Sequence, residues 1–92
     1  MYITVTETDI KAQVKDYLAI KDIFNYPIRQ GLGCTPGLPD RVMHYRGRVH
    51  YLEIKKPGGK LSQHQQDFQE QCRLDGIDYH VIRSLEDIQA IC

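Results

Sequence analysis

Two acidic residues, Asp40 and Glu53, are spaced so that a single β-hairpin would bring their carboxylates together. Segments 41–45 and 48–52 carry valine and tyrosine and flank an Arg-Gly pair at 46–47, which is typical of a two-residue hairpin loop. With that loop, Asp40 faces Glu53 and their Cβ atoms lie roughly 4.5–5.5 Å apart on one face. Facing like charges are destabilising without compensation, and a divalent cation would compensate them. The sequence therefore predicts a metal site.

Lys55 stands two residues after Glu53 and is expected on the same face of the strand, because side chains alternate along a strand. Mg²⁺ takes oxygen ligands from one or two carboxylates, substrate phosphate and water, and the carbonyl of Ile54 would add a further oxygen. A metal there would polarise a phosphoryl oxygen, and Lys55 would offset the growing negative charge. The alternative is a solvated Glu-Lys pair on an edge strand, with Asp40 as a turn acid. The facing acids favour the metal site.

The basic residues are concentrated around the acid pair. Residues 28–60 contain seven basic and two acidic residues, although the whole chain has a net charge of zero. A protein that acts on phosphates requires such a distribution, whereas an ordinary mixed surface is the alternative explanation. Arg41, Lys56 and Lys60 are the candidates for DNA backbone contacts. Solvation of a glycine-rich loop explains Lys56 and Lys60 equally well.

The elements that must position these residues follow from hydrophobic periodicity and turn signals. Thr6 is a candidate N-cap, Ser62 with Gln65 matches a capping box, and Gly76 ends the helix that Ser62 opens. The chain forms one domain, and the predicted fold class is α/β, a small mixed β-sheet flanked by helices in the order α-β-β-β-α-β-α. The expected elements are a helix at 6–24, strands at 26–30 and 41–45, a strand that begins at 48 and is ended by Pro57-Gly58-Gly59, a helix at 62–74, a strand at 77–82 and a helix at 84–91.

The residues around the acid pair resemble a known nuclease group. Pro39-Asp40 followed by Glu53-Ile54-Lys55 fits the PD-(D/E)xK nuclease pattern, and the context resembles the VRR-NUC domains (virus-type replication and repair nucleases). The resemblance covers nearly the whole chain, through Glu7, Gly31, Gly37-Leu38-Pro39-Asp40, Glu53-Ile54-Lys55-Lys56, Gly59-Lys60-Leu61-Ser62, Gln65, Phe68 and Gly76. It implies a restriction-endonuclease-like core and a DNA endonuclease that uses Mg²⁺ or Mn²⁺, of the kind found in phage and in DNA repair.

The resemblance also assigns roles to two further residues. It implies that Glu7 in the first helix completes the metal site, although the helix dipole alone favours an acid there. It implies that Gln65 positions the attacking water or contacts DNA, while closure of the Ser62 capping box is an equally good explanation. The predicted catalytic residues are Asp40, Glu53, Lys55 and Gln65, and the predicted metal ligands are Glu7, Asp40, Glu53 and Ile54.

The expected partners follow from the same resemblance. It implies a homodimer acting on DNA, with branched DNA such as a Holliday junction as a candidate substrate, and no small-molecule organic cofactor. The sequence has no membrane span and no signal region, so we expect a cytoplasmic protein. The resemblance implies that the cell is a bacterium or a phage-infected host. Two other functions remain open: a non-catalytic DNA-binding module that keeps the nuclease fold, and an RNA nuclease on the same core.

Overall fold

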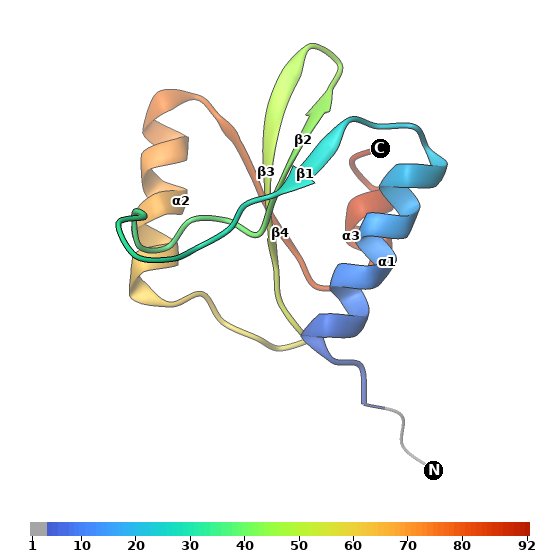
Figure 1. Ribbon diagram of the computed structural model, residues 1–92, viewed down its shortest axis with the longest axis horizontal. Coiled ribbons are helices and arrows are strands. Elements are labelled where there is room, and N and C mark those ends of the chain that lie inside the picture. Colours follow the sequence, from blue (N-terminus) through green and yellow to red (C-terminus); the bar gives the residue numbers. More distant parts are fainter. Residues whose placement is uncertain (1–3) are drawn as a thin grey trace.

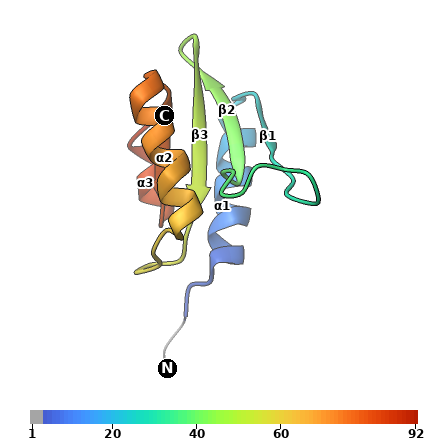
Figure 2. The ribbon, with the colours of Figure 1, turned by 90° about the vertical axis from the view of Figure 1, so that its left-hand side faces the viewer.

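The computed structural model describes residues 4–92 and places a four-stranded sheet between helices (Figure 1). Helix α2 covers one face of the sheet, and α1 and α3 cover the other (Figures 1 and 2). This order of elements confirms the predicted α/β fold class. The elements are α1 (Glu7–Ile20), β1 (Asn25–Pro27), β2 (Arg41–Tyr45), β3 (Arg48–Ile54), α2 (Gln63–Asp75), β4 (Asp78–Ile82) and α3 (Leu85–Gln89).

The sheet is mixed, with the strand order β1-β2-β3-β4. Strands β1, β2 and β3 pair antiparallel, whereas β3 and β4 pair parallel and are joined through α2. Tyr45 pairs with Arg48, which confirms the predicted hairpin register. Arg46 and Gly47 have φ of 52° and 75°, the two positive values that a type I′ turn requires. Pro27 lies on the edge strand β1, where its missing N–H is tolerated.

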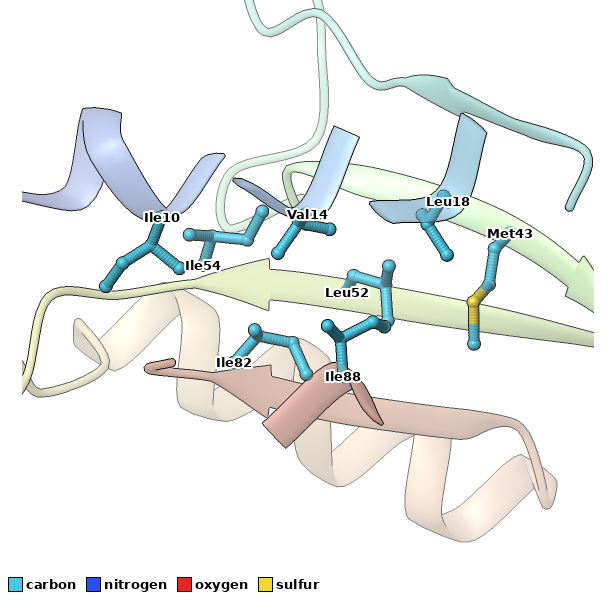
Figure 3. Close-up of a cluster of buried hydrophobic side chains, with 8 residues drawn as sticks. All are labelled: Ile10, Val14, Leu18, Met43, Leu52, Ile54, Ile82 and Ile88. Carbon is cyan, nitrogen blue, oxygen red and sulfur yellow. The ribbon is translucent and has the colours of Figure 1, made fainter. Parts of the chain in front are cut away.

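The main core lies between the sheet and the helices α1 and α3 (Figure 3). Burial of each aliphatic side chain contributes about 1.5–3 kcal/mol to stability. This energy fixes which face of β3 points inward, because a one-residue shift in strand pairing would move every side chain to the other face. Leu52 and Ile54 point into this core, so Glu53 and Lys55 point to the α2 face. The core cluster consists of Ile10, Val14, Leu18, Met43, Leu52, Ile54, Ile82 and Ile88.

Several predicted boundaries differ from the structure, including the end of β3, which lies at Ile54. Helix α1 ends at Ile20 and not at residue 24, because Asp22 has a φ of 56° and the N–H of Ile23 donates to the carbonyl of Leu18 (3.0 Å). Ile23, beyond the end of the helix, still packs against the core. The first strand is shorter than predicted and ends at Pro27, and α3 ends at Gln89. Within residues 4–92, no helix is long and apolar enough to cross a membrane.

Candidate metal and nuclease site

Asp40 lies directly before β2 and is held by hydrogen bonds on both sides. Its N–H donates to the carbonyl of Leu52 (3.1 Å), and its carbonyl accepts from the N–H of Ile28 (2.9 Å). Its carboxylate Oδ2 accepts from the N–H of Ile54 (2.7 Å). The paired residues of the hairpin end at Arg41 and Leu52. Beyond this pair, the side chain of Asp40 accepts the hydrogen bond from the backbone of β3. Asp40 is therefore fixed at the end of β3, beside Glu53.

Glu53 is a buried acid with an incomplete set of partners. It is 2% exposed, and its Oε2 is buried without a hydrogen-bond partner among the described residues. Its Oε1 accepts from Nε2 of Gln65 (3.3 Å) and lies 4.0 Å from Nζ of Lys55. Burial, and then the charge of Asp40, raises the pKa of Glu53 to about 8. The charge of Lys55 lowers the pKa of Glu53, but by less than burial and Asp40 raise it. The positive charge near Glu53 is therefore too small to keep this carboxyl group ionised at its ordinary pKa.

Lys55 follows the last residue of β3 and continues the pairing with β4. Its N–H donates to the carbonyl of Ile82 (2.9 Å), which fixes the backbone where the side chain leaves it. The side chain is 16% exposed, and its ammonium points to Glu53. Lys55 and Glu53 thus share one face of the strand, as side-chain alternation requires. The ammonium can donate hydrogen bonds to a ligand that reaches the acid pair.

Gln65 closes the capping box of α2 and also contacts Glu53, while its predicted contact with the attacking water or with DNA stays a prediction. Its Oε1 accepts from the N–H of Ser62 (2.8 Å), and its own N–H donates to Oγ of Ser62 (3.2 Å), which completes the capping box of α2. Its Nε2 meanwhile donates to Oε1 of Glu53. The oxygen and the nitrogen of one amide serve different partners, so the two roles do not conflict. The helix cap holds Gln65 in position beside Glu53.

The glycine-rich loop before Asp40 packs on the first turn of α2. Gly37 has a φ of 81°, and a Cβ at this position would overlap the backbone carbonyl of His64. Only glycine allows this close approach with that backbone conformation. Pro39, two residues later, is fully buried. The loop therefore packs against the start of α2 three residues before the chain reaches Asp40.

Lys11 is a residue of the site that sequence reasoning missed. Its Nζ lies 3.3 Å from Oε2 of Glu7 and 3.5 Å from Oδ1 of Asp40. Burial opposes the charge of Lys11, but Asp40 and Glu7 outweigh it and raise the pKa of the ammonium. The spacing of Glu7 and Lys11, four residues apart on one helix, is the signal that would have found the pair.

Glu7 thus reaches the acid pair only through a cation. Its side chain is 41% exposed and contacts Asp40 through the ammonium of Lys11. In the part of the chain that the structure describes, no three side chains of His, Cys, Asp or Glu are grouped to hold a metal ion. The role of Glu7 as a metal ligand stays a prediction, and Asp40 and Glu53 are the acids that the fold brings together.

The residues predicted to bind DNA lie on two sides of the acid pair. Arg41 is half-buried, and its Nη1 donates to Oδ1 of Asn25. Lys56 and Lys60 are exposed in the loop that follows β3. This loop is fixed by Arg83, whose Nε and Nη2 donate to the carbonyl of Gly59 (3.1 and 2.9 Å). No local signal pointed to Arg83, because its partner lies 24 residues away.

A second buried polar atom lies on the α2 face of the sheet. The hydroxyl of Tyr79 has no hydrogen-bond partner within residues 4–92. Burial, and then the charge of Glu53, raises the pKa of Tyr79, so the hydroxyl remains a neutral donor. Its ring packs against Phe68, whose other neighbour is Tyr51. Tyr51 and Tyr79 thus pack against the same ring of α2.

His50 and His80 belong to a separate contact. Their rings stack, with Nδ1 of His50 and Nε2 of His80 3.0 Å apart. His50 points to the core side of β3, the face opposite to that of Glu53, because even and odd residues alternate along the strand. His44 contacts Phe24 near the edge strand. His44, His50 and His80 are therefore packed as strand residues.

The donor set fits a divalent cation. A buried carboxylate oxygen without a partner, beside a second carboxylate, is the environment in which a hard cation replaces missing positive charge. Asp40 and Glu53 supply carboxylate oxygens, and Ile54 and Glu7 stay the predicted further ligands. Comparison of this sequence with protein-family models finds no match, and comparison with curated proteins finds none either.

Proposed function

We propose that this protein is a divalent-metal-dependent endonuclease that hydrolyses DNA phosphodiester bonds. One observation carries the proposal: Glu53 is buried with an unpartnered oxygen, beside Asp40 and within 4.0 Å of Lys55. Burial of Glu53 beside a second carboxylate is costly for stability, and a function that requires a cation gives a reason for it. The resemblance of the same residues to the VRR-NUC domains supports the proposal independently of the geometry.

Each residue of the candidate site has a distinct role in the proposed reaction. Asp40 and Glu53 would hold Mg²⁺ or Mn²⁺, and the bound ion would polarise a phosphoryl oxygen and lower the pKa of a water molecule. Lys55 donates to the phosphate oxygens, where negative charge grows as the nucleophile attacks. Gln65 is a positioning residue, because its amide keeps the Glu53 carboxylate oriented through Oε1.

The proposed substrate is DNA that is bound through its phosphate backbone. Basic residues beside the acids contact the phosphate backbone, which positions a protein without reading sequence. A homodimer would present two such sites to two strands and would suit a branched substrate. This step depends on analogy with the family.

The competing proposal is a non-catalytic DNA-binding module that keeps the nuclease fold. The position of Lys11 favours it, because this ammonium already offsets the charge of Asp40 and Glu7 without a metal. The unpartnered oxygen of Glu53 favours the nuclease, because Lys11 does not reach it. We therefore keep the nuclease as the conclusion.

A cleavage assay tests the proposal. Labelled linear, flap and four-way-junction DNAs and a single-stranded RNA are incubated with the protein in Mg²⁺, Mn²⁺ or EDTA. We expect cleavage that requires a metal, disappears in Lys55→Ala and survives in Lys21→Ala, a control at the far end of α1. If the DNAs are bound but never cut, and Lys55→Ala binds as the parent does, the protein is a binding module.

A further inference from the structure

A cavity of about 410 Å³ lies beside Asp40, between α1 and the β1–β2 edge of the sheet. Its wall includes Asp40 and Ile54, so it reaches the acid pair at Asp40, on the side of the sheet opposite to α2. Pro27 and Ile28 form an apolar part of the wall. The cavity therefore shares Asp40 with the candidate metal site and is large enough for part of a nucleotide.

The charged residues of this wall are mostly cations. Three basic side chains, those of Lys11, Lys15 and Arg41, face a single acid, Asp40. Lys11 and Lys15 are four residues apart on α1 and therefore project from the same side of the helix. Since the chain as a whole is neutral, this wall is a local excess of positive charge next to the acid pair.

Two of these cations have no acidic partner. Among the ion pairs within residues 4–92, none includes Lys15 or Arg41. Arg41 is half-buried, and its one side-chain partner there is the neutral amide oxygen of Asn25. A partly buried guanidinium without an anion is costly, and its remaining N–H groups are suited to a phosphate. An anion in the cavity would satisfy both side chains.

We propose that this cavity binds a phosphodiester group of the nucleic-acid strand, adjacent to the phosphate that is cut. That the bound molecule is a nucleic-acid strand rests on the proposed function. The cavity indicates the path that this nucleic-acid strand takes across the protein. The strand passes from Lys55 and Gln65 on the α2 side, across the acid pair, to Lys15 and Arg41 on the α1 side. The apolar wall at Pro27 and Ile28 contacts a sugar, and Asp40 separates the scissile phosphate from its neighbour.

The test measures binding under conditions without cleavage. A labelled single-stranded oligonucleotide is titrated by fluorescence anisotropy in EDTA and in Ca²⁺, with Lys15→Gln, Arg41→Gln and the matched control Lys21→Gln. Lys21 is the C-cap residue of the helix that carries Lys15, about 9 Å further along the helix axis, and its variant loses the same charge. We expect Lys15→Gln and Arg41→Gln to weaken binding by about tenfold, as for other charged hydrogen bonds, and Lys21→Gln to bind as the parent does.

A salt titration shows whether a phosphate is the group bound. Loss of one phosphate contact reduces the slope of log K against log salt by about 0.7 for a single strand. The dinucleotide dTpdT, followed by NMR, is expected to shift amide resonances at Thr8, Lys11 and Lys15 in the parent. Equal affinities and equal salt slopes for the three variants would overturn the inference.

The outcome also separates this inference from the proposed function. If the parent cuts DNA while Lys15→Gln and Arg41→Gln bind and cut as the parent does, the phosphate site is wrong and the nuclease stands. If binding depends on Lys15 and Arg41 but no substrate is ever cut, the phosphate site stands and the nuclease is wrong. A parent that binds no oligonucleotide overturns both.

Discussion

The side-chain amide of Gln65 donates to Oε1 of Glu53 across 3.3 Å and so joins the first turn of α2 to the end of β3. The amide oxygen of the same residue closes the helix cap with Ser62. Folding of α2 and orientation of Glu53 are therefore coupled through one side chain. A substitution at Gln65 that keeps the oxygen acceptor for Ser62 but removes the nitrogen donor to Glu53 shows whether the residue is only a helix cap or also positions Glu53.

In Gln65→Glu, a carboxylate oxygen still accepts from the N–H of Ser62, but the N–H donor to Glu53 is lost. We predict that Gln65→Glu retains the cap at Ser62, loses cleavage activity and places a second carboxylate beside Glu53. Gln65→Ala loses both contacts and is destabilised by about 1 kcal/mol for the cap. Urea unfolding and single-turnover cleavage measure the two effects. Full activity in Gln65→Glu would show that the residue is only a cap.

Glu53 makes stability depend on pH in the metal-free protein. Its pKa of about 8 in the folded protein lies above the ordinary value of 4.5, so the folded protein holds this proton more tightly than the unfolded chain does. The contribution to stability is complete below about pH 4.5 and is lost as the pH rises to about 8. We predict that the free energy of unfolding in EDTA falls between about pH 4.5 and about pH 8, and that Glu53→Gln removes this part of the decline. Identical pH profiles for the two proteins would contradict the prediction.

A divalent cation is predicted to stabilise the folded protein through the acid pair. At a concentration 100 times its dissociation constant, a ligand adds about 2.7 kcal/mol of stability. For a domain of this size, each 1 kcal/mol raises the Tm by about 4–8 °C. We expect Mn²⁺ to raise the Tm of the parent and of Lys21→Gln, EDTA to reverse the rise, and Asp40→Asn to abolish it. An equal rise in Asp40→Asn would place the ion elsewhere.

Gly37 is predicted to be the glycine on which the position of Asp40 depends. Gly33 provides a matched control, because its φ is 85° and a Cβ there would meet nothing within 4 Å. Gly33→Ala should cost only the backbone strain, about 1 kcal/mol. Gly37→Ala adds the overlap with the His64 carbonyl, and we expect a larger loss of stability together with lower cleavage activity. Equal unfolding free energies for the two variants would contradict close packing of this loop on α2.

Local signals explain which parts of the structure could be predicted. The Arg46-Gly47 turn fixes the register of the hairpin, and the capping residues Thr6 and Ser62 fix where α1 and α2 begin. Each of these depends on residues within a few positions of one another, and each was predicted correctly. Side-chain alternation likewise placed Lys55 on the face of Glu53.

The remaining features depend on contacts between distant segments. The ammonium of Lys11 reaches Asp40 from another element, Arg83 holds the loop at Gly59 from beyond β4, and Gly37 is packed by α2. Burial of Glu53 requires α2 and the hairpin together, so the spacing of the acids predicted a pair but not an unpartnered oxygen. No periodicity or turn signal encodes such contacts.

The most direct measurement of the central claim is single-turnover DNA cleavage by the parent and by Glu53→Gln, with Mn²⁺ binding followed on the same samples. We predict metal-dependent cleavage in the parent, and in Glu53→Gln a loss of about 100-fold or more in the cleavage rate together with weaker Mn²⁺ binding. Cleavage by Glu53→Gln at the parent rate, or cleavage by the parent that persists in EDTA, would contradict a metal-dependent nuclease site at Asp40 and Glu53.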